Sequence, residues 1–400
     1  MQGQFARPIK AVNLSPTSCM MANRLEKKLK MPNRRLQNIL GNTALVIASV
    51  FVCFLALEGY LWADALMNRP PAVSAAPPKP PPPLTTDGVQ IPPEIMERAE
   101  ARHRVKTMPA EWALRDVSVP GAAKAYYWQG ALHAQDENGF RRTTPFPPKD
   151  PNVFRIIVVG DSLTFGLGIP EDTTFVALLN QWLQRDYRIE VLNLGVVRYN
   201  SEDVLKTIRT FVPQLQPNLV IYTVCLNDFA PSGSGEYHDE YKYPFPIPGR
   251  IKRFLIANTR SGAFLNDKYD AALRAVHLRG DFFDDILDGF VDSEKRFRRD
   301  VADMNATVTE AGLPPLVAMV VDQYPDYTGK AWKLTEIAED ALAKGGAEVI
   351  PTEAYFRRYH GQTFDVSAFE GHPNEIANYI WANMIAERLM KRADLQQFHR

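Results

Sequence analysis

The feature that most constrains the fold is a mostly apolar, β-branched run at 154–159 that stops abruptly at Gly160-Asp161-Ser162. Such a run, broken only by Arg155, is typical of a buried strand in a parallel sheet. The Gly-Asp-Ser that follows it predicts a tight turn. In open α/β sheets, ligands and chemistry collect at the carboxyl ends of strands. We therefore expect the hydroxyl of Ser162 to face a cleft.

The region after this turn alternates between apolar runs and amphipathic segments. Strands are expected at 153–159, 189–194, 218–225, 315–321 and 347–350, and helices at 172–185, 201–211, 331–344 and 374–391. Alternation of this kind indicates a parallel sheet that is covered by helices on both faces. We predict an α/β protein with a three-layer α/β/α fold and a five-stranded parallel sheet.

A serine becomes a nucleophile only when a base accepts its proton and a third group holds that base in the right tautomer. One histidine lies next to an acid in a suitable place, in Glu370-Gly371-His372-Pro373-Asn374 near the C-terminus. Two further apolar runs end in groups that can donate hydrogen bonds to an oxyanion, at Gly195 and at Asn227-Asp228. These residue types support nucleophilic attack by Ser162 on a carbonyl group.

In these residues the chain resembles the SGNH (GDSL-type) hydrolase superfamily of serine esterases and acyltransferases. Gly160-Asp161-Ser162 resembles the first family block, Gly195 the second, Asn227-Asp228 the third and His372 the last, in family order over about 210 residues. The resemblance covers residues 130–392. It implies a flavodoxin-like SGNH fold, Ser162 as nucleophile, His372 as base, and an oxyanion hole formed by Ser162, Gly195 and Asn227.

The sequence departs from the family pattern in two places. Cys225 stands where the third block has glycine, and we expect only a local adjustment because cysteine is small and tolerates burial. The acid is Glu370, two residues before His372, whereas the family usually has aspartate, often three residues before. Glu370 is the predicted triad acid, and Asp365 is the second candidate. Asp161 is expected to stabilise the turn rather than to take part in the chemistry.

The first 62 residues differ in character from the rest. Residues 1–35 carry eight basic residues and one acid, and 36–57 contain no charge. Extended to Trp62, the apolar run exceeds the ~20 residues that a bilayer requires. A buried core helix or a cleaved signal peptide would also explain such a run. The long basic segment before it favours a transmembrane signal anchor at 36–62 with a cytoplasmic N-terminus.

The predicted organisation has five parts. They are a basic cytoplasmic segment at 1–35, the transmembrane helix at 36–62, a Pro-rich linker at 63–94, a lead-in segment at 95–150 and the hydrolase domain at 151–392. The linker composition favours an extended polyproline spacer. The lead-in is expected to be irregular after a short helix at 94–104. The aromatic-rich insertion at 229–290 is either a cap over the pocket or helical packing at the sheet edge.

Composition excludes several classes of function. The net charge is zero, so no general affinity for nucleic acid is expected. Cys19, Cys53 and Cys225 fall in three different parts of the predicted organisation, so no disulfide is expected within the chain. No metal-ligand spacing and no phosphate-binding glycine loop occur, so neither a metal nor a cofactor is predicted.

The predicted function is a serine esterase or lipase/acylhydrolase-like enzyme that cleaves carboxylic esters, such as O-acetyl groups of envelope carbohydrate. Two alternatives remain open: an O-acyltransferase to envelope polysaccharide with the same triad, and a catalytically inactive envelope-binding protein. The lead-in also resembles that of membrane-anchored bacterial members. We therefore expect a single-pass protein of the bacterial inner membrane with a periplasmic catalytic domain. The expected partners are an ester substrate, envelope carbohydrate or lipid, and the membrane, whereas no protein partner is indicated.

Overall fold

The structure, a computed structural model, describes residues 34–67, 90–105, 108–230, 251, 254–255, 258–276, 290–321, 329–352 and 363–400. Contacts within the chain divide it into two units, residues 1–60 and 61–400. Almost all of the basic segment, most of the Pro-rich linker and much of the insertion lie outside the described residues. The expected polyproline conformation of the linker and the cap over the pocket therefore stay predictions.

Helix α2 (Arg34–Met67) contains the apolar run expected to cross a membrane. Its stretch Gly41–Asp64 has 24 residues and a mean hydropathy of 2.2, which is long and apolar enough for a membrane span. A signal sequence near an N-terminus has the same length and composition. The predicted helix is confirmed as an element that can span a bilayer.

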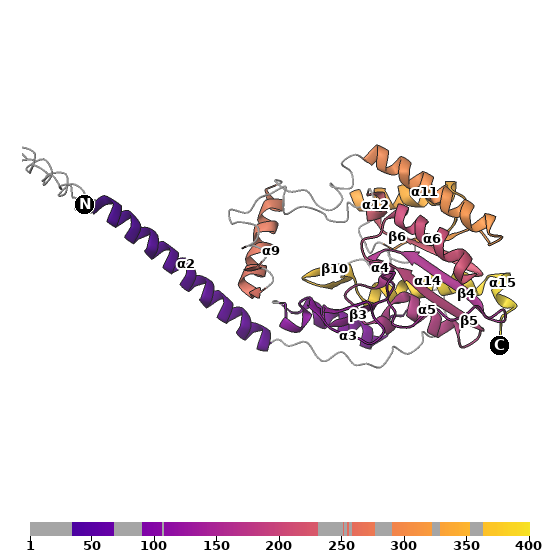
Figure 1. The fold of residues 1–400 in the computed structure, drawn as a ribbon, viewed down its shortest axis with the longest axis horizontal. Helices are drawn as coiled ribbons and strands as arrows, with labels where there is room; N and C mark the ends of the chain where they lie inside the picture. Colours follow the sequence, from indigo (N-terminus) through magenta and orange to yellow (C-terminus); the bar gives the residue numbers. More distant parts are fainter. Residues whose placement is uncertain are drawn as a thin grey trace, which may run out of the picture. The chain divides into compact units, whose positions relative to one another are not determined.

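The larger unit is built around a five-stranded parallel sheet (Figure 1). Its strands are β4 (Phe154–Gly160), β5 (Ile189–Gly195), β6 (Leu219–Val224), β7 (Val317–Val320) and β8 (Glu348–Val349), in the order β5-β4-β6-β7-β8. Gly160 at the end of β4 pairs with Gly195 of β5 and with Thr223 of β6. The carboxyl ends of three adjacent strands therefore lie at one edge of the sheet.

Helices cover both faces of this sheet (Figure 1). Side chains of β4 alternate between two hydrophobic clusters, with Ile156 and Val158 in one and Ile157 and Val159 in the other. The first cluster contains α3 (Pro93–His103), α5 (Phe175–Leu183) and α14 (Glu375–Met390), and the second contains α6 (Ser201–Leu215), α11 (Phe290–Glu310) and α12 (Lys330–Lys344). The predicted three-layer α/β/α fold with a five-stranded parallel sheet is confirmed.

We expect an irregular lead-in segment from the sequence, but the structure shows a small antiparallel sheet there. Its strands are β1 (Arg115–Asp116), β2 (Lys124–Trp128) and β3 (Ala131–Gln135), preceded by the short helix η1 (Ala110–Trp112). Gln129 and Gly130 connect β2 to β3 with φ angles of +51° and +77°. Positive φ at both positions is what a two-residue hairpin turn requires. Gln129-Gly130 thus adopts the conformation of such a turn, although asparagine or aspartate is more usual before the glycine.

A second antiparallel pair lies near the C-terminus, before α14. Strands β9 (Asp365–Ser367) and β10 (Glu370–Pro373) form a hairpin whose register shifts between Glu370 and Pro373. Asn374 then caps α14, since its side chain accepts hydrogen bonds from the amides of Ile376 and Ala377. Three further described elements are η2 (Glu171–Thr173), α9 (Arg260–Ala275) and α15 (Ala393–Gln396).

Candidate active site

Ser162 is the first residue of the four-residue helix α4 (Ser162–Phe165), which follows β4 directly after the cap residue Asp161. Asp161 caps this helix, because its Oδ1 accepts a hydrogen bond from the Leu163 amide over 2.9 Å. Asp161 is fully buried and Ser162 is 6% exposed. The turn thus holds the Ser162 hydroxyl at the carboxyl end of the sheet, and Asp161 has the structural role expected for it.

Two glycines allow α4 to sit on the sheet edge. A Cβ atom on Gly160 would lie 2.1 Å from Oγ1 of Thr164 and 2.7 Å from the carbonyl oxygen of Thr223. A Cβ atom on Gly195 would lie 2.4 Å from the backbone nitrogen of Phe165. Real side chains do not pack so closely, so both positions require glycine. The glycine of Gly-Asp-Ser is therefore needed for packing.

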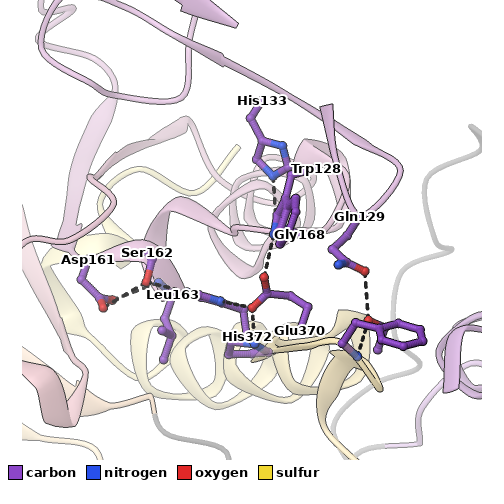
Figure 2. Close-up of polar contacts among 12 residues, drawn as sticks. Trp128, Gln129, His133, Asp161, Ser162, Leu163, Gly168, Glu370 and His372 are labelled. Atoms are coloured by element: carbon purple, nitrogen blue, oxygen red, sulfur yellow. Dashed lines mark hydrogen bonds and ion pairs between the residues drawn. The ribbon is translucent and has the colours of Figure 1, made fainter. Parts of the chain in front are cut away.

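The hairpin β9–β10 brings an imidazole and a carboxylate to this serine (Figure 2). Ser162 Oγ lies 2.9 Å from His372 Nε2, and His372 Nδ1 lies 2.5 Å from Glu370 Oε1. The Glu370 carboxylate accepts a hydrogen bond from Nδ1–H, and this places the lone pair of the neutral imidazole on Nε2, where it can accept the hydrogen bond of the Ser162 hydroxyl. The structure thus brings Ser162, His372 and Glu370, three of the predicted site residues, into one hydrogen-bonded chain.

Interactions with neighbouring carboxylates raise the basicity of the His372 imidazole. Burial lowers the pKa of His372, but the hydrogen bond and the negative charge of Glu370, together with the charges of Asp161 and Asp365, raise it by more, so the net shift is upward from 6.5. Burial raises the pKa of Glu370, and its bonds with His372 and Trp128 more than offset this, so its net shift is downward. Asp365 acts on the pKa of His372 through its charge alone, as the smallest of these causes. Glu370 is the carboxylate in contact with the imidazole.

Ser162 has a second polar neighbour in Asp161. Its Oγ lies 3.3 Å from Asp161 Oδ2, and the same Oδ2 accepts a hydrogen bond from Asn227 Nδ2 over 3.0 Å. One hydroxyl carries one proton, so Asp161 and His372 compete for it, and the shorter distance favours His372. Burial raises the pKa of Asp161. The shared bond to Asp161 Oδ2 holds Asn227 next to Ser162, where the sequence predicted it.

Asn227 belongs to the short helix η3 (Leu226–Phe229), which follows β6. Asp228 holds this helix, because its Oδ2 accepts hydrogen bonds from the Cys225 amide and from the Tyr222 hydroxyl. Cys225 has a φ of −96°, a conformation open to any residue. The backbone conformation therefore allows cysteine where the family pattern has glycine.

The loop after β5 differs from what we expected. The Gly195 amide donates to Asn193 Oδ1 over 2.9 Å, so it is already engaged. Arg198 follows in a turn closed by the bond from the Tyr199 amide to the Val196 oxygen, and its φ is +72°. Among the described residues, the Arg198 amide has no hydrogen-bond acceptor. The Gly195 amide is therefore engaged, whereas the amides of Val197 and Arg198 are free donors among the described residues.

This loop passes the end of β4. It leaves β5 on one side of β4, and the Asn200 side chain donates to the Ala230 oxygen, beyond β6, on the other side. Asn200 also caps α6, as expected. Because Gly160 pairs with Gly195, this loop begins at the same sheet edge at which Ser162 follows β4. The positive φ of Arg198 is the feature that draws attention to this residue. Because arginine does not usually adopt positive φ, the sequence gives no sign of this conformation.

Among the described residues, no group of three or more His, Cys, Asp and Glu side chains is arranged to hold a metal ion. The polar groups of the site are the Ser162 hydroxyl, the His372 imidazole, the carboxylates of Glu370 and Asp161, and amide groups. This set can carry out proton transfer and nucleophilic attack with the chain's own side chains.

A comparison with protein-family models matches residues 158–378 to the GDSL-like Lipase/Acylhydrolase family. The chain belongs to this family. The matched range covers more than half of the chain and contains Ser162, Gly195, Asn227, Glu370 and His372, so the resemblance inferred from the sequence is confirmed. The chain is accordingly a member of a hydrolase family that contains lipases and acylhydrolases.

Several solved structures are similar to this chain at low identity. TesA is 14% identical, with 59% of this chain and 99% of that chain covered and a TM-score of 0.37. The lipase/acylhydrolase from Enterococcus faecalis is 15% identical, with 59% and 94% covered and a TM-score of 0.36. The acetyl xylan esterase AlAXEase is 12% identical, with 59% and 99% covered and a TM-score of 0.35. No curated protein matches the chain. The fold assignment rests on the sheet order and the family match.

Proposed function

We propose that the protein is a serine esterase that cleaves carboxylic esters, with Ser162, His372 and Glu370 as its catalytic triad. The observation that carries this proposal is the unbroken chain of hydrogen bonds from Glu370 through His372 to Ser162. This chain has the order of roles that a general base and its orienting acid require. It also speaks against a catalytically inactive envelope-binding protein, because the unusual glutamate is in contact with the imidazole.

In the first half of the reaction, the oxygen of Ser162 attacks the ester carbonyl while His372 Nε2 accepts the hydroxyl proton. Glu370 then stabilises the positively charged imidazole through Nδ1. His372 returns the proton to the leaving alcohol, and an acyl-Ser162 ester remains. In the second half, water is activated by His372 in the same way and releases the acid.

The oxyanion of the tetrahedral intermediate needs hydrogen-bond donors. We assign the Ser162 amide and the second proton of Asn227 Nδ2, whose first proton goes to Asp161. The sequence predicted the Gly195 amide as the third donor, but that amide would have to leave Asn193 Oδ1 first. We propose the free Arg198 amide in its place. Each such donor contributes ~3 kcal/mol of transition-state stabilisation.

For the substrate and location, we propose esters of envelope carbohydrate, such as O-acetyl groups, or of lipid. The α2 helix would anchor the protein once in the bacterial inner membrane, with the basic segment at 1–35 in the cytoplasm. The linker at 63–94 would then hold the catalytic domain at 151–392 in the periplasm. An acyltransferase would use the same triad, with a sugar hydroxyl in the place of water.

Labelling by a fluorophosphonate probe tests the proposal, because this probe reacts with activated serines. The full-length protein in its membrane should be labelled at Ser162, and Ser162→Ala should abolish labelling. Folded protein that stays unlabelled would overturn the esterase and favour the inactive binding protein.

Acetate release from an acetylated sugar, with and without a sugar acceptor, distinguishes hydrolysis from transfer. Protease added to spheroplasts should digest the catalytic domain if that domain is periplasmic.

A further inference from the structure

The lead-in segment, which precedes the family match, contacts the carboxylate in the site. Trp128 at the end of β2 donates its indole N–H to Glu370 Oε2 over 2.7 Å (Figure 2). The other oxygen, Oε1, accepts from His372 Nδ1 and from the His372 amide. Each oxygen of Glu370 therefore has its own donor, and the carboxylate cannot rotate without losing one of them.

The turn next to Trp128 also bonds to the hairpin that carries Glu370 and His372. Ser367 Oγ donates to Gln129 Oε1 over 2.9 Å, and His103 Nε2 lies 2.7 Å from the Asp365 backbone oxygen (Figure 2 shows the Gln129 contact). Gln129 is only 1% exposed and has a positive φ, which is costly for a residue other than glycine. Such strain persists where the surroundings determine the conformation, and it is often found at functional sites.

The same segment bonds to the loop that follows the nucleophile. The buried guanidinium of Arg141 donates to the backbone oxygens of Gly166 and Ile169 over 2.6 and 2.8 Å. His133 Nε2 accepts the Gly168 amide over 3.0 Å, and burial lowers the pKa of His133 to about 3, which keeps its ring neutral. The small sheet thus contacts both halves of the site: the loop after Ser162 and the Glu370–His372 hairpin.

We propose that Trp128 is a positioning residue that holds Glu370 against His372, and that the lead-in segment is therefore part of the catalytic unit. This inference rests on the proposed function, because it gives Trp128 a role in the same triad. The family match begins at residue 158 and does not include this segment. The functional boundary of the hydrolase domain then lies before β1 rather than at residue 151.

The test compares Trp128→Phe with Trp182→Phe in the full-length protein. Trp182 is a matched control, since it is 7% exposed, packs against Tyr379 at 5.0 Å between ring centroids, and has an indole nitrogen without a hydrogen-bond partner among the described residues. Both variants lose the same atoms, but only Trp128→Phe removes a bond to the site. A second Trp128 variant, with benzothiophene in the place of indole, keeps the shape and removes only the N–H donor.

We expect Trp128→Phe and the benzothiophene variant to lower kcat by about 10- to 100-fold, the range for losing a hydrogen bond to a charged group, with little change in KM. Trp182→Phe should keep kcat within about twofold of the wild type, because the Trp182 indole makes no hydrogen bond to the site. The acid limb of the kcat/KM profile should also move to lower pH in the Trp128 variants, because a loosened Glu370 supports the His372 imidazolium less. Trp128 variants that match Trp182→Phe in kcat and in pH profile would overturn the inference.

A measurement that needs no turnover separates this inference from the proposed function. Diethylpyrocarbonate modifies neutral imidazole, so its rate of reaction with His372 against pH, followed by mass spectrometry, reports the pKa of that histidine. A wild-type protein without esterase activity would refute the proposed function but would leave the positioning role of Trp128 to be decided by the His372 pKa. A lower His372 pKa in both Trp128 variants, with no change in Trp182→Phe, would still support the positioning role, and an unchanged pKa would reject it.

Discussion

The two halves of the candidate site are built in different ways. The nucleophile turn, Gly160 to Phe165, lies at the ends of three paired strands, and Ser162 is 6% exposed. The hairpin β9–β10 has strands of three and four residues, and the side chain of His372 is 27% exposed. The nucleophile is therefore held by the packed sheet, whereas the base and the acid are held by a short hairpin.

The contacts that hold the hairpin come from far along the chain. Trp128 and Glu370 are 242 residues apart, and Gln129 and Ser367 are 238 residues apart. The nucleophile turn thus depends on the close packing of paired strands, and the hairpin depends on a few side-chain bonds to the lead-in segment. Local changes should therefore be costly in the turn and tolerated in the hairpin. Changes to the chemistry of either half should abolish or reduce turnover.

The largest effect is expected for Ser162→Ala. Loss of the attacking oxygen should lower kcat by about 10³-fold or more, because members of a triad act as a unit. The hydroxyl makes few contacts, so the melting temperature should stay within about 2 °C of the wild type, since the change removes a single atom. Hydrolysis of a p-nitrophenyl ester and thermal melting measure the two quantities. Retained activity would mean that another group is the nucleophile.

Glu370→Gln should come next, with kcat lowered by about 10²- to 10⁴-fold, because the imidazole loses the acid that holds its tautomer. Asp365→Asn is the control and should change kcat far less. The active form has neutral His372, whose pKa is raised above 6.5, so wild-type activity should rise with pH through a midpoint above 6.5. Glu370→Gln should move this midpoint down. A larger loss in Asp365→Asn would make Asp365 the acid.

A pair of glycine substitutions compares the two halves directly. Gly195→Ala places a Cβ atom 2.4 Å from the Phe165 backbone nitrogen, so we expect it to destabilise the protein by about 1–3 kcal/mol and to shift the nucleophile turn. Gly371, between Glu370 and His372, has no atom within 4 Å of an added Cβ. Gly371→Ala should therefore be neutral or stabilise by up to about 1 kcal/mol. Urea denaturation measures the free energy of unfolding of both variants. Equal changes would mean that the nucleophile turn and the hairpin tolerate an added Cβ atom equally well.

The smallest effect is expected for Arg198→Gly. Glycine adopts the φ of +72° without strain, but it also makes the unfolded chain more flexible, so stability should change by less than about 1 kcal/mol. The backbone amide stays in place, and esterase activity should stay within about twofold of the wild type, because this amide is the proposed oxyanion donor. A large loss of kcat would show that the guanidinium itself acts on the substrate.

Much of the fold could be predicted because its signals are local. Apolar runs predicted all five strands of the central sheet, and amphipathic spacing predicted α5, α6, α12 and α14. The antiparallel sheet at 115–135 was missed because its strands are short and its turn has glutamine where asparagine or aspartate is more usual. The hairpin β9–β10 was missed for a similar reason, since three or four residues are too few to show a periodicity.

Local signals were enough to predict the layered sheet, the serine at the end of β4 and the histidine near the C-terminus, because apolar patterns and turn residues act over a few neighbouring positions. The contact of Glu370 with His372, the bond that engages the Gly195 amide, and the bond from Trp128 to Glu370 became visible only in the folded molecule. Trp128 and Glu370 are 242 residues apart, and even for neighbours such as Glu370 and His372 the conformation that joins the side chains depends on how whole elements pack. No local pattern of residue types records that packing.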